Sequence, residues 1–457
     1  MPSKAKSTSA IGGKKSRRWH RAVRHLVTRA GFGFTPEELA PYTEISYGDA
    51  VARLTSPSTV DNSALEKMLV EQSFDFTNPD DIKRWWLFRM VFTARPLEEK
   101  MTLFWHGHFA TADYRVRSPY AMYVQNCTMR KLAFGRFDDL LLAMSKDPAM
   151  IIWLDNQQNR KKKPNENYAR EVMELFTMGI GNYSEQDVKE GARAFTGWQT
   201  KPSGYFFNSG QHDDGVKTFL GRSGNFNGDD IVTILANQKA TGRYLAHKLL
   251  RFFALENPPE FFVDDIAAVY HKSDHNIGAM LKAIFSSPAF ASEQCYHSLV
   301  KSPCEYVIGT LKTFQIFKVD AEVPRLMAAM GQNLFNPPSV KGWDGGQSWI
   351  ASDTMMERFN FAARIISQKF DYLEKYSSPA QIAAEQGLTT VDETVDYFLS
   401  LLVDGDAPTS ARARLIEYLS TDMDGKKLDH LPDGKVLDAR LRGLIHLIMT
   451  LPTYQLN

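Results

Sequence analysis

The residues best placed to do chemistry in this sequence are two glutamates in a segment that should be largely apolar. Residues 164–175 have the sequence Pro-Asn-Glu-Asn-Tyr-Ala-Arg-Glu-Val-Met-Glu-Leu, which predicts a helix capped by Asn165 and ended by Gly179. At about 100° per residue, Glu171 falls inside the apolar arc of this helix and Glu174 lies just beyond its edge. A carboxylate on a buried arc costs several kcal/mol unless it is paired, metal-bound or protonated. Glu171 therefore needs a partner.

Two kinds of partner for this carboxylate stay open. The first is a cation in a buried salt bridge, for which the candidates are Arg170, Arg193 and Lys248. The second is a metal ion, because Glu171 and Glu174 resemble the inward acids of di-metal helical bundles, although the Glu-x-x-His of those bundles is missing. The other polar residues of the helical wheel lie at the edge of the arc (Asn167) or face away from it (Glu166, Arg170 and Thr177).

A pair of histidines, His106 and His108, lies near the end of a predicted helix that begins at Pro96. Two histidines at this spacing point to opposite faces of a helix, and they converge only if the helix ends between them, at Gly107. Together with the two glutamates they would then bind one divalent metal ion, Zn, Fe or Mn. The alternative is that each imidazole makes a separate hydrogen bond in the core.

A histidine and two acids also follow one another in an irregular segment, as His212, Asp213 and Asp214. Such a group supplies metal ligands or a general base. The alternative is a solvated turn in which an aspartate caps the local backbone. The chain contains no nucleophile-elbow motif, no phosphate-binding loop and no dinucleotide fingerprint, so we expect no nucleotide cofactor.

Aromatic residues gather in two long irregular segments, about 199–228 and 331–350, and at their borders. Side chains of this kind stack on sugar rings or line a pocket, or they pin the loop to the body of the protein. The residues concerned are Trp198, Tyr205, Phe206, Phe207, Trp343 and Trp349.

Helical periodicity dominates the rest of the chain and must position these residues. We expect a mainly α fold, a large multi-helix globular body with two long irregular loops and little or no sheet apart from a short ribbon near Tyr205. The expected organisation is a basic disordered tail at 1–20, a helical core domain at 21–375 and a helical extension packed on that core at 376–457.

The net charge, the apolar runs and the cysteines of the chain exclude several classes of function. The chain has 457 residues and a net charge of +1, so nucleic acid is not an expected partner. No apolar run approaches the roughly 20 residues that span a bilayer, and no apolar segment follows the basic start as in a signal peptide. The three cysteines, Cys127, Cys295 and Cys304, form no metal-binding pair and are expected to be free buried thiols. The sequence alone therefore predicts a cytoplasmic protein.

At its motifs the chain resembles a bacterial family, domain of unknown function 1800. The resemblance runs from about residue 21 to 370 and includes the C-terminal residues 451–456. The matching segments are Arg29–Gly33, Glu99–Thr111, Pro164–Leu175, Ala192–Trp198, His212–Gly221, Lys301–Pro303 and Asn336–Trp343.

The resemblance implies a mostly helical body and a single site formed by the three polar motifs. Genes of this family commonly neighbour those of a second family, domain of unknown function 1501, whose members look like sulfatase relatives and often carry export signals. The resemblance therefore implies such a protein as partner, and with it a route out of the cytoplasm to the periplasm.

Two functions follow as hypotheses. In the first, the chain is a metal-dependent enzyme, a hydrolase of an extracellular glycan or similar polymer. In the second, it is a non-catalytic binding or scaffold protein that holds the sulfatase-like partner or a saccharide. The first assigns metal binding to His106, His108, Glu171, His212 and Asp213. It assigns catalysis to Glu171, Glu174 and Asp214, and substrate binding to Trp105, Asn167, Arg170, Trp198, Lys217 and Trp343.

Overall fold

The fold is known from a computed structural model that describes residues 14–316, 319–367, 378–421, 426–428, 431–432 and 434–457. Helices make up most of this part of the chain, and its only strands form two short antiparallel pairs. The prediction of a mainly α fold is therefore confirmed. No helix in the described residues is both long and apolar enough to cross a membrane.

Helices begin where the sequence provides local caps. Thr35 accepts a hydrogen bond from the backbone N–H of Glu38, whose carboxylate accepts one from Thr35 in return, and this capping box starts α2 (Pro36–Thr43). Ser184 and Asp187 form the same arrangement at the start of α12 (Glu185–Ala194), as the sequence predicts.

The first half of the body is built from short and medium helices. In chain order they are α1 (Lys14–Ala30), α2, α3 (Tyr47–Thr55), α4 (Ser63–Glu71), α5 (Pro79–Phe92), α6 (Pro96–His108), α7 (Asp113–Val116), α8 (Pro119–Leu132), α9 (Phe137–Ser145), α10 (Pro148–Trp153), α11 (Asn167–Glu171) and α12. Helix α1 begins at Lys14, so residues 14–20 of the expected disordered tail are helical, while residues 1–13 lie outside the described chain.

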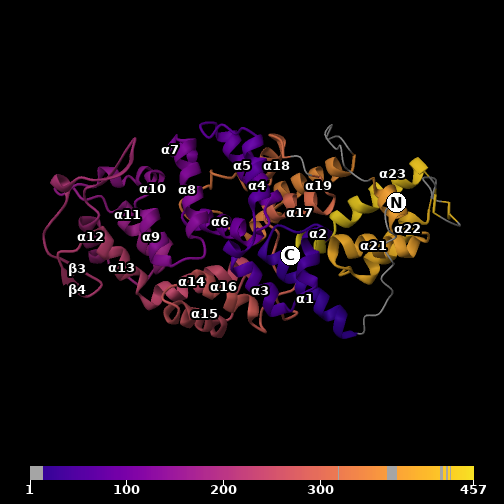
Figure 1. Cartoon of the computed structure of the whole chain (residues 1–457), viewed down its shortest axis with the longest axis horizontal. Helices are drawn as coiled ribbons and strands as arrows, with labels where there is room; N and C mark the ends of the chain where they lie inside the picture. Colours follow the sequence, from indigo (N-terminus) through magenta and orange to yellow (C-terminus); the bar gives the residue numbers. More distant parts are fainter. Residues whose placement is uncertain (1–13, 317–318, 368–377, 422–425, 429–430, 433) are drawn as a thin grey trace.

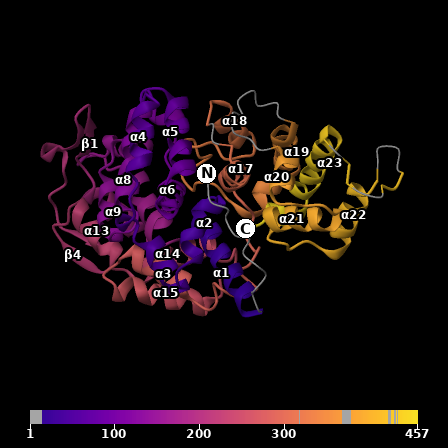
Figure 2. The same ribbon diagram turned by 45° about the vertical axis from the view of Figure 1, so that its right-hand side comes forward.

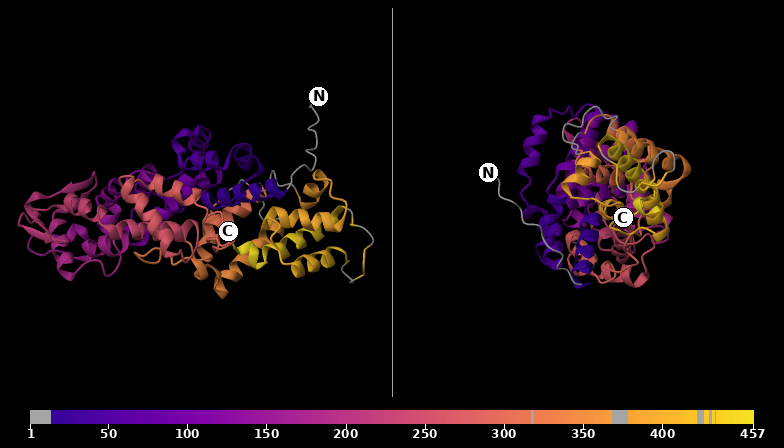
Figure 3. Two further views of the ribbon diagram at one scale, coloured as in Figure 1. Left: turned by 90° about the horizontal axis from the view of Figure 1, so that it is seen from below. Right: turned by 90° about the vertical axis from the view of Figure 1, so that its right-hand side faces the viewer.

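The second half continues with α13 (Gly228–Ala236), α14 (Lys239–Phe253), α15 (Glu260–Lys272), α16 (Ile277–Ser286), α17 (Pro303–Thr313), α18 (Glu322–Ala329), α19 (Ser352–Ser367), α20 (Pro379–Glu385), α21 (Val391–Val403), α22 (Thr409–Leu419) and α23 (Gly434–Met449). Helix α14 packs on α15, α15 packs on α16, and α16 reaches back to α3. These elements, with α6 and α17, form the middle of an elongated molecule (Figures 1 and 3).

The two irregular segments are ordered and differ in structure. In the first, β1 (Trp198–Lys201) pairs with β2 (Gly204–Phe207), which confirms the expected ribbon, and β3 (Lys217–Phe219) pairs with β4 (Arg222–Gly224). Strand β3 packs on α12 and strand β1 packs on α10, at one end of the molecule (Figure 1). The second segment runs through a short 3-10 turn, η5 (Gly346–Ile350), and lies close to α6. At Gly342, which has φ +81°, a Cβ atom would stand 2.2 Å from the Gly107 carbonyl oxygen, so only glycine fits.

The C-terminal helices form the opposite end of the molecule, where α19 to α23 pack together (Figure 2). The chain then returns to the body through η6 (Pro452–Gln455). The backbone N–H of Lys301 donates to the Gln455 carbonyl oxygen at 2.8 Å, and that of Asn457 donates to the Leu299 carbonyl oxygen at 2.8 Å. The final residues of the chain are therefore paired with the core. The expected boundary at 375/376 falls in residues 368–377, which are outside the described chain.

Candidate functional site

The glutamate-bearing helix is not a regular α-helix. Helix α11 ends at Glu171 and continues as a π-helix, η3 (Val172–Thr177). A π-helix has more residues per turn than an α-helix, so positions after Glu171 rotate away from the wheel that the sequence suggests. Thr177, which was expected to face away from the core, is fully buried and donates its hydroxyl to the Val172 carbonyl oxygen at 2.6 Å. That expectation was wrong for this geometric reason.

Glu171 is half-buried, and within the described part of the chain it makes no hydrogen bond and no ion pair. Burial and the negative charge of Glu174 raise its pKa, while Arg170 and Lys341 act in the opposite direction. Glu174 is satisfied differently, because it accepts a hydrogen bond from the Tyr183 hydroxyl at 2.7 Å. The carboxylate that the sequence marks as unpaired therefore has no direct protein partner in the described chain.

The cations expected to neutralise Glu171 are oriented elsewhere. Arg170 forms two hydrogen bonds with Glu185, at 2.7 and 2.8 Å. Arg193 does the same with Asp213, at 2.8 and 3.2 Å. Lys248 lines a cavity, described below.

The two histidines make separate hydrogen bonds to the backbone. His106 is buried, and its Nε2 accepts a hydrogen bond from the backbone N–H of Phe335 at 3.1 Å. His108 is also buried, and its Nε2–H donates to the Phe176 carbonyl oxygen at 3.0 Å, which leaves Nδ1 without a partner among the described residues. Burial lowers the pKa of His106 to about 3, and burial together with the charge of Lys248 holds the pKa of His108 well below its usual range. Both rings are neutral.

The positions of the two histidines bear on the hypothesis that they bind one metal ion together. Helix α6 continues through Gly107 to His108, so the two imidazoles keep the divergent directions of a helix. Across the described residues, no three side chains of histidine, cysteine, aspartate or glutamate come together in a way that would hold a metal ion. The metal site therefore stays a prediction, and we derive no chemical step through a metal.

The His-Asp segment forms a closed network of its own. The Nδ1–H of His212 donates to the Thr196 carbonyl oxygen at 2.9 Å. Hydrogen bonding and the charge of Arg193 lower the pKa of Asp213 to about 2. Lys217 is fully buried, and its Nζ donates to the carbonyl oxygens of Asp213 and Gly215, at 2.5 and 3.0 Å. These contacts hold the loop together beside α12.

The remaining residues assigned to catalysis or substrate binding are buried in the core, line a cavity or lie on the surface. Trp105 and Trp198 are buried and pin their segments, the first through a hydrogen bond from Nε1 to the Ala133 carbonyl oxygen at 3.2 Å. Asn167 donates to the Leu154 carbonyl oxygen at 3.1 Å. Trp343 lines a cavity, whereas Asp214 is exposed, with its carboxylate 3.6 Å from the Lys161 ammonium.

That cavity has a volume of about 520 Å³ and lies where four of the sequence motifs meet. The end of α6, the π-helix η3, helix α14, the start of α17 and the second irregular segment all contribute to its wall. The residues that matter for its chemistry are Phe104, His108, Leu175, Tyr244, His247, Lys248, Arg251, Phe252, Glu256, Lys341, Trp343, Asp344 and Trp349.

Lys248 differs from the buried cations of this protein. The fully buried arginines and lysines of the described chain all donate to a carboxylate or a carbonyl oxygen; they are Arg29, Arg89, Lys100, Lys217, Lys312 and Arg358. Lys248, partly buried in the cavity wall, has no such acceptor in the described chain, and its Nζ lies 5.5 Å from the centre of the Tyr244 ring. Burial and the positive charge of Arg251 lower its pKa to about 8.

The other charges of the cavity are partly matched. Arg251 lies 3.8 Å from a carboxylate oxygen of Glu256 and 3.5 Å from the Asp344 carbonyl oxygen. Lys341 is exposed at the cavity edge and is close enough to Glu171 to lower its pKa. The cavity thus combines aromatic walls with an unmatched ammonium group.

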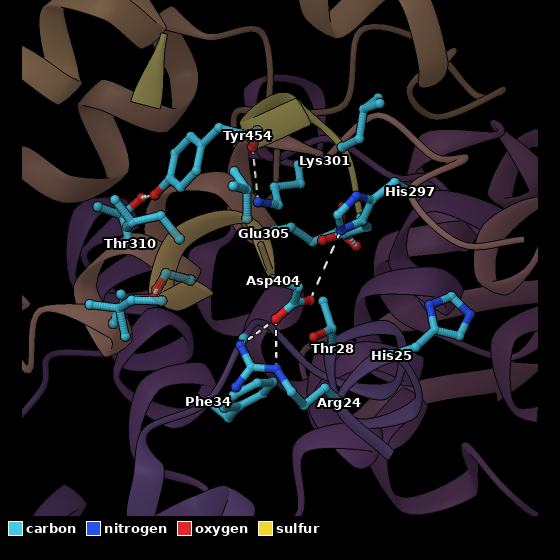
Figure 4. Close-up of a pocket in the computed structure, with 18 of the residues that line it drawn as sticks. Arg24, His25, Thr28, Phe34, His297, Lys301, Glu305, Thr310, Asp404 and Tyr454 are labelled. Atoms are coloured by element: carbon cyan, nitrogen blue, oxygen red, sulfur yellow. Dashed lines mark hydrogen bonds and ion pairs between the residues drawn. The ribbon is translucent and has the colours of Figure 1, made fainter. Parts of the chain in front are cut away.

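A second cavity, of about 330 Å³, lies where the C-terminal helices meet α1 and α17 (Figure 4). Its charged side chains Arg24 and Lys301 both donate to protein acceptors, although His25 Nε2 and Thr453 Oγ1 have no partner among the described residues. Arg24 Nε donates to Asp404 at 2.6 Å, and Lys301 Nζ donates to the Tyr454 carbonyl oxygen at 2.9 Å. The hydroxyl groups of Thr310 and Tyr454 form a hydrogen bond of 2.7 Å. These contacts attach the C-terminal segment to the core, and the larger cavity is the better candidate site.

With this geometry established, the chain can be placed among known proteins. A family model described as "Protein of unknown function (DUF1800)" matches residues 25–456, nearly the whole chain. The protein belongs to this family, and the resemblance inferred from the motifs is confirmed. No curated protein and no solved structure matches the chain.

Sequence reasoning considered Lys248 only as a partner for Glu171 and missed its place in the cavity. A signal for it exists in helix α14, where Tyr244, Lys248 and Phe252 follow one another at four-residue spacing and share one stripe. A lysine in an aromatic stripe at the edge of a buried arc is as unusual as a glutamate in an apolar one.

Proposed function

We propose that this protein binds a small anionic ligand in the cavity around Lys248. The observation that carries the proposal is the Lys248 ammonium, which is partly buried without an acceptor among the described residues. A charge left in such a position is costly unless something pairs with it. A carboxylate, sulfate or phosphate group of a ligand would supply the missing partner.

The shape and walls of the cavity favour a ligand the size of one or two sugar rings. Its volume of about 520 Å³ lies within the range of about 300–1,000 Å³ that is typical of small-molecule sites. Phe104, Phe252 and Trp343 provide faces on which a ring would pack. An acidic, sulfated or phosphorylated sugar combines the two features, and we propose this class.

The proposal favours the binding function over the metal-dependent hydrolase. The hydrolase requires His106 and His108 to bind a metal together, whereas each uses its Nε2 on a different backbone group. A hydrolytic reaction on a glycan stays a prediction, as does the partner from the domain of unknown function 1501 family. Export from the cytoplasm with such a partner stays a prediction as well.

Thermal unfolding of the full chain with glucuronate and with glucose tests the proposal. At equal ionic strength we expect glucuronate to raise the melting temperature and neutral glucose to have a much smaller effect. A hundredfold excess over Kd adds about 2.7 kcal/mol to the free energy of unfolding. Sulfate and glucose 6-phosphate extend the series to the other two anions.

Lys248→Met should abolish the stabilisation by glucuronate. The matched control is Lys282→Met, which removes an exposed lysine on α16 and should leave the effect intact. Equal responses to all three anions and to glucose, or an unchanged response in Lys248→Met, would show that the cavity does not bind an anion through Lys248.

A further inference from the structure

We propose that the ligand of the larger cavity carries a carbonyl group next to its anionic group, and that the Lys248 amine forms an imine with that carbonyl. This inference rests on the proposed function, because pairing of the anionic group with protonated Lys248 brings the carbonyl beside the nitrogen, which must then lose its proton before it attacks. It adds a covalent step and narrows the ligand class to oxo acids, including sugar acids in their open aldehyde form.

The contacts around Lys248 leave its amine available. A nucleophilic amine must have its nitrogen lone pair free and must be reachable from the space where the ligand lies. Lys248 lines the cavity, donates to no acceptor in the described chain, and has its Nζ 5.5 Å from the centre of the Tyr244 ring. Phe104 and Phe252 line the same cavity.

A neutral imidazole lies near the amine. His108 lines the same cavity, and the Phe176 carbonyl fixes its tautomer by accepting the Nε2–H. Its unprotonated Nδ1 has no partner among the described residues. The charge of Lys248 lowers the pKa of His108, so the two groups are close in space. His108 therefore adds no positive charge beside the amine, and the nearby positive charge is that of Arg251.

The reaction is balanced without an oxidant or a cofactor. Neutral Lys248 forms after its ammonium proton passes to solvent water. The nitrogen lone pair attacks the carbonyl carbon, and a C–N bond forms as the C=O π bond breaks. A proton then passes from the nitrogen to the oxygen, directly or through water, to give a neutral carbinolamine. Loss of this hydroxyl as water produces the C=N bond of the imine. Hydrolysis by the reverse route releases the ligand.

The protonation state of Lys248 is suited to this step. Burial and the charge of Arg251 lower its pKa to about 8, so Lys248 is neutral in about half of the molecules at pH 8. An ordinary exposed lysine, with a pKa near 10.4, is neutral to only about 0.4% at the same pH.

Lys301 in the second cavity is a matched comparison within the same protein. Its pKa is also lowered to about 8 by burial. Its amine, however, donates to the Tyr454 carbonyl oxygen at 2.9 Å and lies 4.4 Å from the centre of the Tyr454 ring (Figure 4). The two lysines share a lowered pKa and a place in a cavity wall, and they differ in whether the nitrogen donates a hydrogen bond. Reactivity of Lys248 alone would therefore identify the absence of that hydrogen bond as the cause.

Reductive trapping with glyoxylate, an aldehyde that carries a carboxylate, tests the inference on the full chain at pH 8. Cyanoborohydride delivers hydride to the imine carbon and leaves a stable secondary amine, which peptide mass spectrometry locates. We expect Lys248 to be modified at least tenfold faster than Lys301 and Lys282, and sulfate to protect it by occupying the anion position.

Two variants separate this inference from the proposed function. Lys248→Arg keeps the positive charge but cannot form an imine, so it should still be stabilised by glucuronate and should lose the trapped product. Lys301→Met should trap glyoxylate at Lys248 like the wild type. If Lys248 reacts no faster than Lys282 or Lys301 while glucuronate still stabilises the wild type, the covalent step is refuted and the anion site stands. If neither effect is seen, both are refuted.

Discussion

Replacing Lys248 by methionine should stabilise the protein when no ligand is bound. The Lys248 ammonium has lost water on folding and has gained no acceptor in the described chain. Methionine has a similar length and carries no charge, so it removes this penalty and still fills the cavity wall. A site that is shaped for a ligand is expected to be less stable without it.

The lowered pKa gives the magnitude. The pKa of Lys248 falls from 10.5 to about 8 on folding, and each pH unit corresponds to about 1.4 kcal/mol. The folded protein is therefore destabilised by about 3 kcal/mol at pH 7, where the lysine is charged in both states. Because the side chain is not fully enclosed, part of this is screened, and we expect a gain of about 1–3 kcal/mol for Lys248→Met.

The sign of the pH dependence follows from the same shift. Between pH 8 and 10.5 the unfolded chain holds the Lys248 proton and the folded chain has released it. The unfolded state thus binds more protons, and the stability of the wild type rises with pH across this window. The advantage of Lys248→Met should be complete below pH 8 and should disappear by about pH 10.5.

The measurement is the difference in melting temperature between Lys248→Met and the wild type from pH 7 to pH 10.5, without ligand. Lys282→Met is the control and should differ little from the wild type at every pH, because Lys282 is exposed. A loss of stability in Lys248→Met at pH 7, or a gain that does not change with pH, would refute the argument that Lys248 is an uncompensated charge.

Two further predictions concern the walls of the cavity and the metal hypothesis. Gly342→Ala places a Cβ atom 2.2 Å from the Gly107 carbonyl oxygen at φ +81°, so it should lower the free energy of unfolding by more than about 3 kcal/mol. Gly387→Ala, at φ +67° with no atom within 4 Å, should cost only about 1–2 kcal/mol, and calorimetry that finds equal losses would contradict the close approach. Elemental analysis of the purified protein should find well below one equivalent of Zn, Fe or Mn. One full equivalent of metal in the wild type that is absent from Glu171→Gln would instead support a metal site at Glu171.

The helix start predicted at Pro96 is confirmed. Helix starts of the capping-box type depend only on residues that are neighbours in the chain. The boxes at Thr35 and Ser184 form between residues three apart, and no distant contact is needed to make them. The ribbon around Tyr205 was predicted for a similar reason. Prediction failed at Thr177, because an α-helical wheel was applied to residues that adopt a π-helix.

The candidate site was predicted only in part. The motifs around His108 and Trp343 do meet at one cavity, together with Leu175 from the glutamate-bearing helix. The expectation that His212 joins them is not met in the geometry, since its loop forms separate contacts with Thr196 and Arg193 beside α12. Membership of one family pattern does not by itself require the motifs to share a site.

The sequence by itself determined the helical class, the family and the presence of a glutamate that needs explaining. The predicted N-cap Asn165 was wrong, because α11 has Glu166 at that position and Asn165 accepts a hydrogen bond from the Asn167 N–H. The tertiary structure decided which polar groups are satisfied. His106 meets the backbone of Phe335, and His108 meets that of Phe176, through contacts between residues far apart in the chain. The state of Lys248 likewise depends on four other segments that enclose it. Burial and hydrogen bonding at such distances arise from packing, which no local pattern specifies.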